Sequence, residues 1–153
     1  MQRKLCLLGE SSPLVLCTVS AARDRLPGHD EDDLKSLWEE GRILYAWNIG
    51  LGESIDARLL PDAIDHYART QGKTPYPRTE DQVLAQLCMS AKPWLTTTQL
   101  KIMLNCGATH IMNLIEAGQL KLQPGTQYGR GGANVALITI PSIKNFLKQR
   151  RLP

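Results

Sequence analysis

Residues 95–118, reading LTTTQLKIMLNCGATHIMNLIEAG, constrain the fold more than any other part of this chain. They contain two short segments, 100–104 and 111–115, in which apolar residues recur at helical spacing. Residues 105–107 (Asn-Cys-Gly) separate the segments, because Asn and Gly adopt backbone conformations that a helix interior excludes. Two short helices with so tight a connection predict a helix-turn-helix.

Each predicted helix has its own boundary signals. Thr96 and Gln99 have the spacing of a capping box, in which each side chain bonds to the backbone amide of the other residue. Gly107 is an acceptable, weaker N-cap for the second helix. Gly118 stands where a left-handed residue is needed after that helix.

The following residues predict a hairpin and a closing helix. Residues 119–123 are expected to form a strand, 124–134 a glycine-rich hairpin tip, and 135–140 the returning strand. Residues 141–151 then predict a helix with Ile143, Phe146 and Leu147 facing inward.

Helix, turn, helix, hairpin and basic final helix, in this order, resemble the winged helix-turn-helix module of the excisionase and MerR-like DNA-binding families over about residues 94–151. The resemblance implies that the second helix enters the major groove of duplex DNA and that the hairpin tip, the wing, lies against the backbone. On this chain the implied DNA-binding positions are Thr109, His110, Met112, Asn113, Lys121, Gln127, Tyr128, Arg130, Lys144 and Lys148, with Ala108 also facing the groove.

Two positions depart from the pattern of these families. Ala108 stands where they often have an arginine or serine, and Asn113 where they often have an arginine. The second helix therefore carries no positive charge, and affinity is expected to depend on the wing and the last helix. Basic residues at the end of that helix also suit its negative terminus without any DNA.

Charge is divided unevenly along the chain. Residues 1–76 contain nine Lys/Arg and twelve Asp/Glu, for a net charge of −3, whereas residues 77–153 contain nine and three, for +6. This asymmetry favours a polyanion as partner of the second half only. The acidic first half favours a protein partner or a homodimer contact.

The first half contains weaker versions of the same signals. Residues 5–8 and 14–19 are two apolar runs that indicate a hairpin or a pair of strands, and 20–26 predict a short helix ended by Pro-Gly. Asp30 is expected to cap a further helix, which Gly41 ends.

Residues 37–43 (LWEEGRI) parallel 114–120 (LIEAGQL), and each is followed by a predicted hairpin, a proline and a helix. We therefore expect an α+β fold of tandem winged helix-turn-helix-like modules, with small helices and short β-hairpin wings, in which the first copy (about 14–70) is degenerate. The alternative is that any two helix-hairpin-helix units match this loosely.

The expected domains are a degenerate module at 1–69, a linker at 70–78, a linking helix at 79–93 and the DNA-binding module at 94–153. The linker is rich in proline and glycine, and Thr79 is a suitable cap for the helix that follows.

Nothing in the sequence indicates catalysis, a cofactor or a metal site, since the three histidines lie apart without carboxylates or cysteines at ligand spacing. The four cysteines are also far apart, which favours reduced thiols in a cytoplasmic protein. No apolar run approaches the ~20 residues of a membrane span. We expect sequence-specific binding of double-stranded DNA, as an excisionase-like factor or a transcriptional regulator. The alternative is a protein–protein interaction adaptor whose modules bind no DNA.

Overall fold

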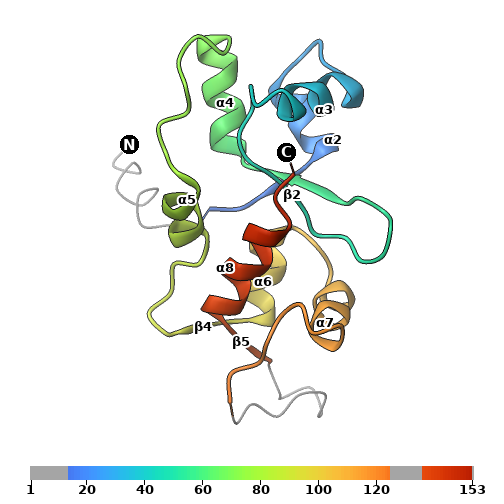
Figure 1. Ribbon diagram of the computed structural model, residues 1–153, viewed down its shortest axis with the longest axis vertical. Coiled ribbons are helices and arrows are strands. Elements are labelled where there is room, and N and C mark those ends of the chain that lie inside the picture. Colours follow the sequence, from blue (N-terminus) through green and yellow to red (C-terminus); the bar gives the residue numbers. More distant parts are fainter. Residues whose placement is uncertain (1–13, 125–135, 153) are drawn as a thin grey trace, which may run out of the picture.

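A computed structural model of the chain describes residues 14–124 and 136–152. These residues form a mixed helix and sheet structure with seven helices and small antiparallel sheets, which agrees with the predicted α+β class. Figure 1 shows α2, α3 and α4 at one end of the long axis and α6, α7 and α8 at the other. None of the helices in the described ranges is long and apolar enough to cross a membrane.

The first half builds three helices on a three-stranded sheet. Its elements are, in order, β1 (Cys17–Thr18), α2 (Val19–Arg25), α3 (Glu31–Glu39), β2 (Ala46–Asn48), β3 (Ala57–Leu59) and α4 (Pro61–Thr70). Strand β3 is central and runs antiparallel to both neighbours, so that Arg58 lies opposite Thr18 of β1 and Trp47 of β2.

After a linking helix, the second half has a similar order of elements, but its described residues contain no strand between the second helix of the pair and the last strand. Its elements are α5 (Glu80–Leu87), β4 (Trp94–Thr96), α6 (Thr97–Leu104), α7 (Ala108–Glu116), β5 (Leu137–Thr139) and α8 (Ile140–Gln149). Strand β5 pairs with β4 on one side. On its other side it bonds to residues 121–123, through Gln123 N to Leu137 O (2.7 Å) and Thr139 N to Lys121 O (3.0 Å). In each half the last strand therefore lies between two backbone partners: β3 between β1 and β2, and β5 between β4 and residues 121–123.

The two halves also agree in how their helices α3 and α7 end. Gly41 after α3 and Gly118 after α7 both have left-handed backbones, with φ of 76° and 79°. The two residues after each glycine donate their amides to one carbonyl, that of Leu37 (2.9 and 3.2 Å) or of Leu114 (2.9 and 3.3 Å). The local parallel seen in the sequence is therefore also a parallel of backbone structure.

The apolar core crosses between the halves. A smaller cluster under α2, α3 and α4 contains residues of the first half, with Leu152 packed against it. The larger cluster joins side chains of both halves, and Trp47 of β2, which is fully buried, belongs to it. First-half members of this cluster are Leu16, Tyr45, Trp47, Ile49, Leu60 and Ala63.

The C-terminal segment extends the first sheet. Asn48 N donates to Arg150 O (2.8 Å), and Leu152 N donates to Ala46 O (2.7 Å), so residues 150–152 run along β2. Figure 1 shows this end of the chain beside β2, between the two groups of helices. The end of one half is thereby part of the other.

Several predicted boundaries were wrong. The strand expected within 14–19 is only Cys17–Thr18, because the Thr18 hydroxyl accepts the amide of Ala21 (3.1 Å) and so begins α2. The other apolar run, 5–8, lies outside the described residues. The linking helix was expected at 79–93 but ends at Leu87, and beyond it Ser90 accepts the amide of Lys92 (3.1 Å) and stabilises a turn instead.

Two further differences concern the second sheet. Strand β4 at Trp94–Thr96 was not predicted. The returning strand, expected at 135–140, is β5 at Leu137–Thr139, since Pro141 has a preset φ that suits the first turn of a helix and draws Ile140 into α8.

Candidate nucleic-acid interface

The predicted helix-turn-helix is α6 and α7, and its boundaries follow the sequence signals. Thr96 and Gln99 form the capping box: the Thr96 hydroxyl accepts the Gln99 amide (3.1 Å), and the Gln99 side chain accepts the Thr96 amide (2.8 Å). Asn105 adopts a left-handed backbone, with φ of 56°, and ends α6. Gly107 precedes α7 without a side-chain cap, as expected for glycine.

Helix α7 has one buried stripe and one exposed face. Ile111 and Leu114 are fully buried and fix the helix against the core. The exposed face is composed of Ala108, Thr109, Met112, Asn113 and Glu116. Four of the predicted groove-facing residues, Ala108, Thr109, Met112 and Asn113, therefore share a solvent-exposed face, and the last three offer a hydroxyl, a thioether and an amide.

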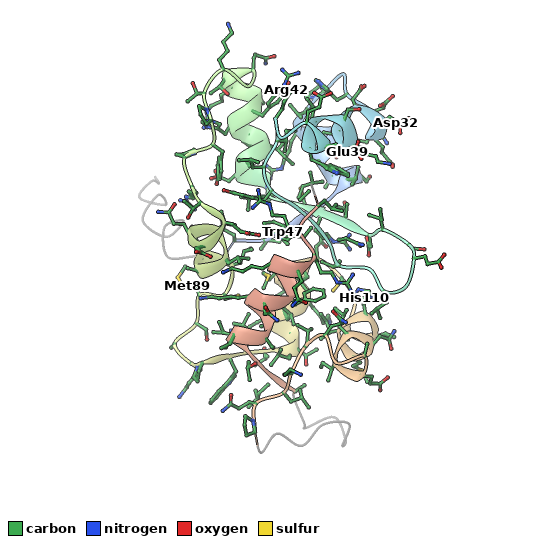
Figure 2. The ribbon with its side chains drawn as sticks, viewed as in Figure 1. Asp32, Glu39, Arg42, Trp47, Met89 and His110 are labelled. Atoms are coloured by element: carbon green, nitrogen blue, oxygen red, sulfur yellow. The ribbon has the colours of Figure 1, made fainter. Side chains whose placement is uncertain are left out.

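His110 has a different environment from the other predicted groove residues. Its Nε2 atom lies 2.6 Å from the carbonyl oxygen of Ile49, in the loop between β2 and β3, and the side chain is half-buried. Figure 2 shows His110 on the side of α7 that faces this loop. The structure thus uses His110 to join α7 to the first half of the chain.

Arg58 is a residue that the sequence analysis did not identify. It is the only charged side chain that is buried in the described part of the chain. From β3 its Nε donates to Leu104 O (2.8 Å) and its Nη2 to Asn105 O (2.9 Å), while Nη1 lies 2.5 Å from an oxygen of Asp56. Arg58 therefore satisfies the carbonyl groups at the end of α6, which would otherwise lack donors. An isolated arginine in a short strand gives no sequence signal for this contact.

The predicted phosphate-binding lysines of α8 lie beside acidic residues of α5. Lys148 Nζ is 2.9 Å from a carboxylate oxygen of Asp81. This hydrogen bond and the positive charge of Lys148 lower the pKa of Asp81. The same bond and the negative charge of Asp81 raise the pKa of Lys148. Lys144 is half-buried on the same helix, and its charge acts on Asp81 in the same direction.

The two arginines after α8 also have partners within the chain. Arg150 Nη1 donates to Gly50 O (2.9 Å), and Arg151 pairs with Glu80 (3.3 Å) while covering the ring of Tyr45. The basic end predicted for the second half is thus largely directed at α5 and at the first half.

Only the base of the predicted wing lies within the described residues. Lys121 is exposed there, and its amide is bonded to the hydroxyl of Ser142 (3.1 Å). Gln127, Tyr128 and Arg130, the predicted wing-tip contacts, lie outside the described residues.

The corresponding helix of the first half presents a different surface. Helix α3 buries Leu34 and Leu37, which match Ile111 and Leu114 of α7. Its exposed residues include Glu31, Asp32, Asp33, Lys35, Ser36 and Glu39. Figure 2 shows Asp32 and Glu39 on α3, at the opposite end of the molecule from α7. Phosphates would be repelled there, so of these two helices α7 is the candidate for contact with DNA.

Comparison with known proteins adds no further guide: no family model, no curated protein and no solved structure matches the chain. Within residues 14–124 and 136–152, no three His, Cys, Asp or Glu side chains gather as ligands for a metal ion.

Proposed function

We propose that this protein binds duplex DNA sequence-specifically, with α7 in the major groove, and that its halves are tandem winged helix-turn-helix-like modules of which only the second contacts DNA. The observation that carries the proposal is the exposed polar face of α7 above a fully buried stripe, in a helix that follows a tight, capped turn. A rigid helix with one free polar face is what readout of base edges requires.

Four of the five exposed residues of α7 suit distinct roles in the groove. Asn113 can donate to and accept from an adenine edge, and the Thr109 hydroxyl can bond to a base or a phosphate. Met112 offers an apolar contact for a thymine methyl group. Ala108, at the start of the helix, is small enough to allow close approach of the backbone.

Phosphate contacts would come mainly from outside α7. Lys121 is exposed at the base of the wing. Arg130 is assigned to the wing tip by the sequence. Lys148 would exchange Asp81 for a phosphate, at little cost because the ion pair is exposed to solvent.

The biological setting that suits such a protein is excision of a mobile element or regulation of transcription, in which DNA is marked or bent without chemistry. The cytoplasm suits its free thiols Cys17, Cys88 and Cys106.

Fluorescence anisotropy with labelled duplex DNA tests the proposal. We expect binding at low salt, with log K falling by about 0.9 per log unit of salt for each neutralised phosphate. Thr109→Ala and Asn113→Ala should change the preference among selected sequences. Asp32→Ala and Ser36→Ala, at the matching positions of α3, are the controls and should leave that preference unchanged.

Absence of binding to random and selected duplexes at low salt would refute the proposal. It would also be refuted if the α3 controls altered sequence preference as much as the α7 variants.

A second candidate function is a protein–protein adaptor. One observation favours it: α7 carries no cation, ends in Glu116 and exposes Met112. If this is the function, Met112→Glu should abolish co-purification of a partner, while duplex DNA should not compete with that partner.

A further inference from the structure

A shallow apolar groove of about 110 Å³ lies on a part of the surface that the DNA-binding proposal does not use. Seven of its eight lining residues are apolar, and they come from the segment before β1, from the end of α5, and from β4 and α6. Figure 2 shows Met89, one of these residues, just beyond α5 and on the opposite side of the molecule from His110.

Apolar exposure is concentrated at this groove. The described residues have five exposed large apolar side chains, and three of them, Val15, Met89 and Ile102, line it. Ile102 is 59% exposed although it lies in the middle of α6. Single exposed apolar residues are ordinary, but a cluster of them marks a surface that another group covers.

The chain itself enters the described structure at this groove. Leu14 and Val15 form part of its wall. Leu16, the next residue, is fully buried, and its amide donates to the carbonyl of Met103 at the end of α6 (2.9 Å). Leu14, the first described residue, therefore lies in the wall of the same groove as Ile102.

We propose that the apolar run at residues 5–8 (Leu-Cys-Leu-Leu) of the same chain occupies this groove. The run has no charge, and the connection at 9–13 (GESSP) contains the residue types that favour turns. Six residue steps separate Leu8 from Leu14 and can span up to ~20 Å. The groove follows α6 from Gln99 to Met103, which is only about 6 Å along the helix axis.

Tethering favours this segment over a second copy of the chain. A short flexible connection gives the attached group an effective concentration in roughly the millimolar range. A second molecule would reach such a concentration only in very concentrated solution, so the groove should be filled from within the chain.

Disulfide trapping in the full chain tests the proposal. In a Cys106→Ser background, which removes the cysteine four residues away, Ile102→Cys supplies a thiol in the groove. The second thiol of the disulfide is native Cys6 in one variant and Leu7→Cys, combined with Cys6→Ser, in another. Both positions are tried because neighbouring residues of an extended segment face opposite ways. Cys17 and Cys88 should not compete, since burial raises the pKa of each to about 11 and thiolate is the reactive form.

We expect mild oxidation to close an intramolecular disulfide between position 102 and position 6 or 7, at least tenfold faster than with Ile55→Cys as the control partner. Ile55 is also exposed, at 61%, but lies in the loop between β2 and β3. Mass spectrometry and non-reducing gels would show a faster-migrating monomer. No closure from either position, closure at the rate of the control, or only disulfide-linked dimers would overturn the proposal, and the last result would identify a second copy as the occupant.

Discussion

Arg58 shows how one buried charge can connect two parts of a chain. Its guanidinium bonds to two carbonyl groups at the end of α6, more than forty residues away in the sequence. A buried cation is costly unless it is fully hydrogen-bonded, and here both the carbonyl groups and the Asp56 carboxylate provide partners.

Replacing Arg58 should therefore destabilise the protein strongly. Arg58→Met leaves the carbonyls of Leu104 and Asn105 without donors, and we expect a loss of about 3 kcal/mol in the free energy of unfolding. Urea denaturation would measure it. Arg25→Met is the matched control, because Arg25 pairs with Asp65 at the surface (2.7 Å) and should change stability by less than about 1 kcal/mol. Equal losses in the two variants would contradict this role of Arg58.

The buried thiols predict a pH dependence. Burial raises the pKa of Cys17 and Cys88 from 9.0 to about 11. The native protein should therefore react with Ellman's reagent at these thiols much more slowly than the urea-unfolded chain at pH 8, and faster as the pH approaches 11. Because the unfolded chain releases these protons first, the free energy of unfolding should fall between about pH 9 and pH 11. Rapid native labelling at pH 8 would show that the thiols are accessible.

At the scale of single elements, the capped helix starts were predictable. Asp30, Thr79 and Thr96 each make the cap or capping box expected of their residue types, because such contacts join residues three apart. Helix and strand ends were less predictable. The stop of α5 at Leu87 depends on the Ser90 turn, and β4 exists only because β5 lies beside it.

The cap of α6 can be tested directly. Thr96→Ala removes the hydroxyl that accepts the Gln99 amide, and we expect a loss of about 1 kcal/mol in stability. Thr98→Ala, at an exposed position inside α6, should stay within about 0.5 kcal/mol of the parent protein. Thermal denaturation followed by circular dichroism would compare them. A Thr98 effect as large as that of Thr96 would mean that the cap is not what stabilises the helix start.

At the scale of the whole molecule, the described structure joins the halves by three kinds of contact. The larger apolar cluster contains residues from both, residues 150–152 run along β2, and His110 and Arg58 bond across the boundary. A chain of two independently stable modules would not need these contacts.

We therefore expect one cooperative unfolding transition. Two variants that each retain a single tryptophan, Trp38 in the first half or Trp94 in the second, should give superimposable urea curves by fluorescence. Deleting residues 150–153 should shift both curves together to lower urea. Two separate midpoints, or a shift confined to Trp38, would show that the halves unfold independently.

The sequence by itself determined the features that rest on local contacts. Apolar spacing identified the buried stripes of α6, α7 and α8, and the caps and glycines identified most helix boundaries. It also indicated the parallel between residues 37–43 and 114–120, because the backbone hydrogen bonds that end each helix join residues only a few positions apart in the sequence. The DNA-binding role inferred from these features remains a prediction.

Only the tertiary structure decided how the charged and polar side chains are used. The sequence assigned His110 and Lys148 to DNA, whereas the fold places them against Ile49 and Asp81, and it buries Arg58 under the turn after α6. These partners lie far away along the chain and are brought together by the shared core. Local spacing contains no information about such contacts, and so it could predict the helices but not what their polar side chains contact.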